Sequence, residues 1–253
     1  MNGASPELVV LALGAVFGAV AGSFLATILI RWPQGRSIVA GRSACDRCGT
    51  KLGTIDLVPV VSYAARRGRC RACNARIDPR HPIVELAAVM VALVALLAHP
   101  LPLGAVTTAL GLWLLLAAML DVEHEWLPDA LTLPLIPLGL AAAWAGFGPP
   151  LPERLAGAAL GWAALFLMAL AYRRLRGREG LGGGDPKLLA ALGAWVGALQ
   201  LPFVLLGAGL VGLAAAALMR LRGQEVSGTS RLPLGALMAL AAWPIWLVVA
   251  SRG

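Results

Sequence analysis

The amino-acid sequence predicts an all-α, polytopic membrane protein, and two observations support this prediction. Hydrophobic residues make up 59% of the 253 residues and charged residues only 13%, with a mean hydropathy of +0.79. Soluble domains average about 45–50% apolar and 25% charged residues. The chain also contains several apolar runs close to the roughly 20 residues that a helix needs to cross a membrane. These runs lack the period-two alternation expected of the strands of a membrane barrel.

We expect about eight transmembrane helices, the first of which should remain as a membrane anchor. Leu8–Ile30 is too long for the roughly 7–15-residue core of a signal peptide, and no basic residue precedes it. Gly14, Gly18 and Gly22 recur every four residues in this run and predict a face for close helix packing. The expected spans are residues 8–30, 83–98, 103–120, 128–147, 155–172, 187–199, 202–219 and 232–249.

Basic residues predict the orientation of these helices. Lys187 and Arg220 lie at the two ends of the apolar stretch 188–219, which we therefore interpret as two helices that turn near residues 200–202. The positive-inside rule then places the basic loops in the cytosol and both termini outside, with only Arg154 and Arg252 on the outer side. The net charge of +8 is explained by this topology, so we expect no nucleic-acid partner.

The loop between the first two helices carries all four cysteines. Two C-x₂-C pairs separated by 21 residues have the arrangement of a zinc ribbon, and a small or turn-forming residue follows each pair. Two disulfides are the alternative, but thiols stay reduced in the cytosol. Four thiolates leave no open position for water, so the zinc would be structural. The predicted ligands are Cys45, Cys48, Cys70 and Cys73, and the residues that follow the pairs are Gly49 and Asn74.

Two carboxylates stand at the ends of apolar runs. Asp121 directly follows one run, and Asp185 begins another after three glycines. A carboxylate at the edge of a membrane is expensive to desolvate, so a functional role is the default interpretation. We expect both at the cytosolic membrane edge, sharing one proton as in aspartic proteases. One would then act as general base on a water molecule while the other acts as general acid.

Structural roles compete with this interpretation. Asp185 could simply cap a helix, with Pro186 at the first helical position. The preceding glycines permit positive φ and a close approach to a substrate strand. Asp121 shares its segment with other acids, of which Asp129 is well explained by helix capping after Pro128. The remaining acids there are Glu123 and Glu125.

Other chemistries are poorly supported. The segment 124–128 begins like the zinc-protease motif H-E-x-x-H but has Pro128 in place of the second histidine. Residues 182–187 lack the spacing of a phosphate-binding P-loop. A proton- or cation-coupled carrier with a regulatory cysteine loop is the alternative function, because acids within a membrane also mark ion pathways. Carriers, however, place their sites near the bilayer midplane rather than at its edge.

A series of short motifs runs through nearly the whole chain. They are Gly22-Ser23-Phe24-Leu25, Arg31-Trp32-Pro33, Arg42-Ser43-Ala44-Cys45, Gly68-Arg69-Cys70-Arg71-Ala72-Cys73, Arg80-His81-Pro82-Ile83-Val84-Glu85, the segment Asp121–Pro134 and Gly182-Gly183-Gly184-Asp185-Pro186-Lys187-Leu188. With these motifs the chain resembles the bacterial type IV prepilin peptidases, also called leader peptidase/N-methyltransferases.

The resemblance implies two activities. One is cleavage of the leader of prepilins and pseudopilins at the cytosolic face of the inner membrane, with Asp121 and Asp185 in the positions of the catalytic aspartates. The other is N-methylation of the new amino terminus with S-adenosylmethionine, associated with the cysteine-bearing loop. The glycines of residues 182–184 and Lys187 would form a loop against the substrate. The implied organisation is a first transmembrane helix (1–31), a zinc-binding loop (32–82) and a seven-helix peptidase core (83–253).

The chain departs from the usual residues of that family at three places. Ala26 replaces an asparagine, Asp78 and His81 replace a serine and a tyrosine, and Leu234-Gly235-Ala236 replaces Phe-Gly-Pro. We expect none of these departures to touch the pair of aspartates. They bear instead on methyl transfer and on substrate preference.

Overall fold

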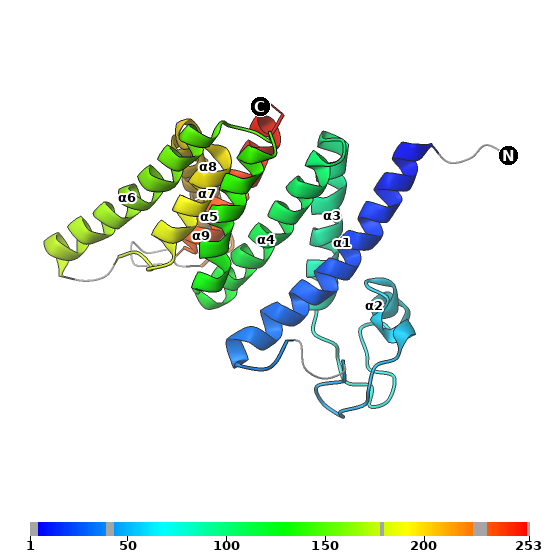
Figure 1. Cartoon of the computed structure of the whole chain (residues 1–253). Helices are drawn as coiled ribbons and strands as arrows, with labels where there is room; N and C mark the ends of the chain where they lie inside the picture. The colour runs from blue at the N-terminus through cyan, green and yellow to red at the C-terminus, as the bar shows by residue number, and fades with distance from the viewer. Residues whose placement is uncertain (1–4, 39–42, 178–179, 225–231, 252–253) are drawn as a thin grey trace. The chain divides into compact units, whose positions relative to one another are not determined.

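The computed structural model describes residues 5–38, 43–177, 180–224 and 232–251, and it is drawn in Figure 1. Over these ranges the chain is helical, and its only extended pairings are the isolated bridges Ala44–Lys51 and Arg69–Arg76. The all-α prediction is therefore confirmed for the described residues. Arg42 and Arg252, which entered the motif and topology predictions, lie outside them.

Apolar helices lie at all eight predicted positions in the described part of the chain. Five of them, α1, α3, α4, α6 and α8, are long and apolar enough to cross a membrane. The helices α5 and α9 have 16 residues each, and α7 has 12, which at about 1.5 Å per residue gives α7 a length of roughly 18 Å. The bounds are α1 Pro6–Arg31, α3 Arg80–Ala98, α4 Leu103–His124, α5 Asp129–Trp144, α6 Leu151–Arg176, α7 Asp185–Val196, α8 Leu201–Leu221 and α9 Leu234–Val249.

The stretch 188–219 forms two helices, as predicted, but the break comes earlier than residues 200–202. The helix α7 ends at Val196, and Gly197 follows with a φ of 83°. A short 3-10 turn, Ala198–Gln200, then leads into α8. Only glycine adopts such a positive φ without strain, and a Cβ at Gly197 would also collide with the side chain of Glu153. Glycine chemistry therefore fixes the position of the break.

The chain divides into two compact units, residues 1–112 and 113–253. In the first unit, α1 and α3 pack side by side along their lengths (Figure 1). A Cβ on Gly18 would lie 2.8 Å from the carbonyl oxygen of Ala88, and a Cβ on Gly22 would lie 2.8 Å from the Cβ of Ala88. The predicted close-packing face of the first helix is therefore confirmed, because any larger side chain would push α3 away.

The loop between α1 and α3 forms a small module in the first unit. It contains the 3-10 turns Trp32–Gln34 and Thr54–Leu57 and the short helix α2, Val61–Ala65. The helices of this module are too short to bury a hydrophobic core of their own, so other contacts must hold it together.

In the second unit, α7 is the central element. It contacts α5, α6 and α9, which surround it in Figure 1. Every residue from Leu188 to Val196 is buried. Gly193 of α7 faces Gly157 of α6 so closely that neither position has room for a Cβ. This short helix is therefore enclosed by protein.

Arg154, in the first turn of α6, ties the C-terminal end of α7 to its neighbours. Its side chain is fully buried and donates to the carbonyl oxygens of Gly139 at 2.6 Å and Ala194 at 3.4 Å. It also donates to carbonyls of the α5–α6 connection, and its guanidinium lies 5.4 Å from the ring centre of Trp246. The topology prediction treated Arg154 as a loop charge on the outer side, whereas here it is an internal donor that satisfies helix-end carbonyls.

The contact between Gly157 and Gly193 predicts opposite effects for two similar substitutions. We expect Gly193→Ala to destabilise the protein by about 1–3 kcal/mol because the new methyl group overpacks the α6–α7 contact. Gly209→Ala, in α8, has nothing within 4 Å of the new methyl group and should be neutral or slightly stabilising, since alanine favours helix. Thermal unfolding of both variants in detergent measures this difference, and equal melting temperatures would contradict it.

Candidate functional site

The second unit brings Asp121 and Asp185 together. Asp121 lies in the last turn of α4, which continues to His124, so this residue does not follow its helix as predicted but belongs to it. Asp185 is the first residue of α7. They are only 6% and 8% exposed, and their carboxylates are close enough for their charges to interact. Two buried acids therefore share one site.

The beginning of α9 holds Asp121 in place. The backbone N–H of Ala236 donates to Oδ2 of Asp121 at 2.8 Å, and a Cβ on Gly235 would lie only 3.0 Å from that same oxygen. The expectation that the Leu234-Gly235-Ala236 departure does not touch the pair is therefore wrong. Because proline has no N–H, a prolyl residue at position 236 could not make this hydrogen bond. The two partners lie 115 positions apart, and no sequence pattern indicated their contact.

Asp185 is held by the glycine turn that precedes it. Its Oδ2 accepts from the backbone N–H of Gly182 at 3.1 Å. The N-cap of α7 is Gly184 and no side chain caps the helix, so the alternative in which Asp185 is an ordinary helix cap is not supported. None of the glycines 182–184 has a positive φ either. Gly184 is needed for its small size, since a Cβ there would lie 2.7 Å from the Cβ of Leu127.

An ion pair links the first turns of α5 and α7 beside the two acids. Nζ of Lys187 lies 2.6 Å from Oδ1 of Asp129, whose side chain remains 58% exposed. The N-cap of α5 is Pro128, so Asp129 does not cap its helix as predicted. Leu127 packs against both Gly184 and Gly235. The ends of four helices, α4, α5, α7 and α9, therefore meet around the two carboxylates.

This geometry leaves each carboxylate partly free for chemistry. A carboxylate has two oxygens and can accept several hydrogen bonds. Oδ2 of each aspartate is oriented by a backbone N–H, at Ala236 for Asp121 and at Gly182 for Asp185. No side chain of the described residues hydrogen-bonds to either carboxylate, so each can still accept from a water molecule or a substrate. A buried pair of this kind can share a proton and act on water as base and acid.

The module of the first unit brings its four cysteines together. All four Sγ atoms lie within 4.8 Å of one another, and none is in a disulfide. Sγ of Cys45 lies 3.8 Å from that of Cys73, and Sγ of Cys48 lies 4.0 Å from that of Cys70. Thiolates at about 2.3 Å from a tetrahedral zinc ion would be about 3.8 Å apart. The cluster could therefore hold a metal ion, and the disulfide alternative is excluded.

Two equivalent turns present these cysteines. The N–H of Cys45 donates to Thr50 and that of Leu52 to Ser43, at 2.9 and 2.8 Å. The same bonds recur 25 positions later, and the turn residues Gly49 and Asn74 have φ values of 69° and 57°. The later bonds run from the N–H of Cys70 to Ala75 and from the N–H of Ile77 to Gly68. Beyond the two cysteine pairs, this repeat was not apparent in the sequence.

The thiols of the cluster differ in acidity. The hydroxyl and the backbone of Thr50 lower the pKa of Cys48 to about 6. At Cys73 a hydrogen bond from the backbone N–H of Ala75 lowers the pKa. Desolvation and the neighbouring thiols outweigh this effect and raise the pKa of Cys73 to about 11. Binding of a metal ion deprotonates such thiols. Nearby, a hydrogen bond from the backbone N–H of Gly53 lowers the pKa of Asp56, and the positive charges of Arg66 and Arg71 lower it further.

The chain is similar to characterised families and proteins over most of its length. The profile of the bacterial peptidase A24 N-terminal domain matches residues 16–99, and that of the type IV leader peptidase family matches residues 108–217. A prepilin leader peptidase/N-methyltransferase of Pseudomonas putida is 34% identical over 91% of this chain and 88% of its own length. The enzyme of the same name from Pseudomonas aeruginosa is 40% identical over 82% of this chain and 71% of its own.

A protein of Escherichia coli described as a type 4 prepilin-like proteins leader peptide-processing enzyme is 34% identical over 90% of both chains. No solved structure matches the chain significantly. The two profiles together cover parts of both units, and the relatives match most of the chain. The chain belongs to the type IV leader peptidase family.

Proposed function

We propose that this protein cleaves the leader from type IV prepilins and pseudopilins and then methylates the new amino terminus with S-adenosylmethionine. Membership of the family and the names of the relatives support both activities. The observation on which the peptidase rests is the pair of buried carboxylates, Asp121 and Asp185, each with one oxygen held by a backbone N–H. The carrier alternative is not retained, because the family and the names of the relatives describe leader peptidases.

In the proposed mechanism the two carboxyl groups share one proton before substrate binds. The ionised carboxylate removes a proton from a water molecule as that water attacks the scissile carbonyl carbon. The protonated carboxyl group donates its proton to the carbonyl oxygen. The carboxyl group that took the proton from water then gives it to the departing amine as the peptide bond breaks. Gly182, Gly183 and Gly184 form the turn before Asp185, whereas Lys187 lies in the first turn of α7 and not in the loop as predicted. The substrate would lie along this turn.

We place the protein in the bacterial inner membrane, with the cysteine module and the acids at the cytosolic face and both termini outside. The distribution of basic residues supports this orientation. A site at the end of the helices suits a substrate whose own membrane helix begins beside the scissile bond, because only the edge of the bilayer needs to open.

The metal ion proposed for Cys45, Cys48, Cys70 and Cys73 is zinc in a structural role. When bound, it would crosslink the two cysteine turns. In the described residues each turn has one isolated bridge of its own, and no such bridge joins the two turns. Four thiolates close its coordination sphere, so it would not activate water. It would instead supply the stability that a module without a core lacks.

The carboxylate pair predicts which acids are essential. We expect Asp121→Asn and Asp185→Asn each to lower the rate of leader cleavage by about 100-fold or more, because each removes an acid–base group. Asp129→Asn is the matched control and should retain most activity, since Asp129 is largely exposed and paired with Lys187. Mass spectrometry of a prepilin incubated with each purified variant measures cleavage. Full cleavage by either of the first two variants would exclude the pair as the catalytic groups.

The two exposed thiols of the cluster predict a pH dependence. In metal-free protein at pH 7.5, Cys48 should be a thiolate because its pKa is about 6, whereas Cys73, with a pKa of about 11, should remain protonated. Iodoacetamide should therefore alkylate Cys48 first, and Cys73 should catch up only as the pH rises. Peptide mapping after timed alkylation gives the order. Addition of zinc should protect both thiols, and equal rates without metal would contradict the prediction.

The proposed zinc site predicts unequal effects on the two activities. Cys73→Ser should release the metal and loosen the module, lowering N-methylation more strongly than leader cleavage, because the two acids lie in the other unit. Metal analysis of the purified variant and mass spectrometry of the processed pilin report the two consequences separately. Absence of zinc from the parent protein, or equal loss of both activities, would count against this role.

A further inference from the structure

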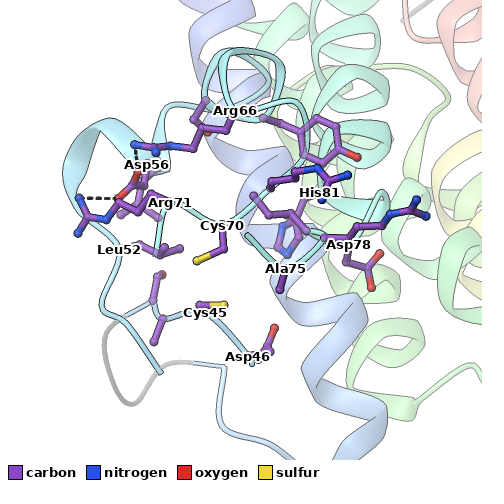
Figure 2. A pocket seen from close by; sticks show the side chains of 18 of the residues that line it. Cys45, Asp46, Leu52, Asp56, Arg66, Cys70, Arg71, Ala75, Asp78 and His81 are labelled. Atoms are coloured by element: carbon purple, nitrogen blue, oxygen red, sulfur yellow. Dashed lines mark ion pairs between the residues drawn. The ribbon is translucent and has the colours of Figure 1, made fainter. Parts of the chain in front are cut away.

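A large cavity lies in the first unit, between the cysteine module and the ends of α1 and α3 (Figure 2). Its volume is about 800 Å³, within the roughly 300–1,000 Å³ of small-molecule sites. Ser23 and Thr27 of α1 and Glu85 of α3 contribute to one wall, and Tyr63 and Cys70 of the module contribute to another. The cavity is therefore enclosed by both parts of the unit.

A metal ion held by the four cysteines would not fill this cavity. Cys45 and Cys70 line it, but their sulfur atoms face the other two cysteines at metal-binding distances. Four thiolates complete a tetrahedral site and need no further ligand. The cavity is thus an additional space, for which the cysteine cluster forms part of the wall.

Most acids around the cavity are neutralised within the protein. Asp56 pairs with Arg66 at 2.5 Å and with Arg71 at 3.4 Å, as Figure 2 shows. Asp46 pairs with Arg36 at 2.7 Å and Asp78 with Arg80 at 2.5 Å. These carboxylates are therefore not free to neutralise other cationic groups.

Four arginines of the cavity lining lack an acidic partner among the described residues. They are Arg31 at the end of α1 and Arg47, Arg69 and Arg76 of the module. An arginine can bind a carboxylate through two parallel hydrogen bonds. The cavity therefore favours a ligand with an anionic group at this side.

Glu85 gives the cavity one acid of a different kind. This side chain lines the cavity yet is only 4% exposed, and no lysine or arginine pairs with it in the described part of the chain, although His81 lies near it. Its Oε2 accepts from the N–H of Val60 at 2.7 Å. A buried carboxylate with only one neutral donor needs further hydroxyl donors or a positive charge.

The residue that donates to Glu85, Val60, has a strained backbone. Val60 has a φ of 61°, which is rare for a β-branched residue. Its N–H is the group that binds Glu85. Strained backbone of this kind persists where the surroundings impose it and is frequent at ligand sites. Tyr63 and His81 add aromatic surfaces to the lining, and His81 lies across from Asp56 in Figure 2.

We propose that this cavity binds the methyl donor, an adenosyl sulfonium compound of an amino acid. Glu85 accepts hydrogen bonds from the ribose hydroxyls, as acids do in dinucleotide sites, and Arg31 binds the carboxylate of the amino-acid part. The assignment rests on the proposed function, since it presumes that the chain methylates. It agrees with the division of the chain, because the leader-peptidase profile begins at residue 108 and leaves the cavity to the N-terminal domain.

The charge of the cavity argues against the prepilin leader as its occupant. The resemblance to prepilin peptidases implies a short basic leader, whereas the lining contains six arginines and four acids, three of which are already paired. Methyl transfer itself needs only the two reactants. The amine lone pair forms the new N–C bond, the C–S bond breaks with its electrons left on sulfur as a neutral thioether, and the amine proton passes to solvent.

The test measures binding of S-adenosylhomocysteine, the demethylated product, to the full-length zinc-loaded protein in detergent by isothermal titration calorimetry. Glu85→Gln keeps an oxygen for the N–H of Val60 but loses the negative charge. Arg31→Gln loses the cation. We expect each to bind at least about tenfold more weakly, as for loss of a hydrogen bond to a charged group. The matched controls, Glu7→Gln and Arg67→Gln, change exposed residues outside the cavity and should bind like the parent.

Mass spectrometry of a prepilin processed by the parent protein separates this inference from the proposed function. If the parent methylates but both cavity variants bind like the parent, the cavity assignment is wrong and the proposed function stands. If the parent cleaves but neither methylates nor binds the compound, methylation fails and the assignment fails with it. Zinc content and melting temperature identify a variant that has not folded. If Glu85→Gln does not fold, binding of S-adenosylhomocysteine by Arg31→Gln alone tests the cavity assignment.

Discussion

Desolvation of two carboxylates is the constraint on which the arrangement of the second unit depends. A carboxylate enclosed by apolar helices is unfavourable unless it is hydrogen-bonded or protonated. Backbone N–H groups meet this requirement, chiefly that of Ala236 for Asp121 and that of Gly182 for Asp185. These donors can reach the acids only where helices end, because N–H groups within a helix are already bonded to its own carbonyls. Four helix ends therefore gather at one place.

The short helix α7 makes this gathering possible. Because protein surrounds its 12 residues, it does not need the length of a membrane span. Arg154 donates to the carbonyl of Ala194 near its other end, and Gly193 lets α6 approach closely there. Both contacts restrain the helix that carries Asp185, so residues far from the acids help to position them.

The cysteine module meets a different constraint. Its helices and turns are too short to bury a core, and two similar cysteine turns replace that core with a cluster of four sulfur atoms. The module then closes over the ends of α1 and α3 and leaves a cavity between them. Ion pairs such as Asp56 with Arg66 line this space, and Glu85 adds a buried carboxyl group to it.

The sequence by itself determined the features that depend on neighbouring residues. Hydropathy located every apolar helix, the spacing of the cysteines identified the cluster, and the family motifs selected Asp121 and Asp185 from several acids. Only the tertiary structure decided that α9 supplies the donor for Asp121, that Arg154 is an internal donor, and that Glu85 faces a cavity. Each of these is a contact between segments far apart in the chain. Hydropathy and motif spacing describe single segments, so they carry no information about which backbone group reaches which side chain.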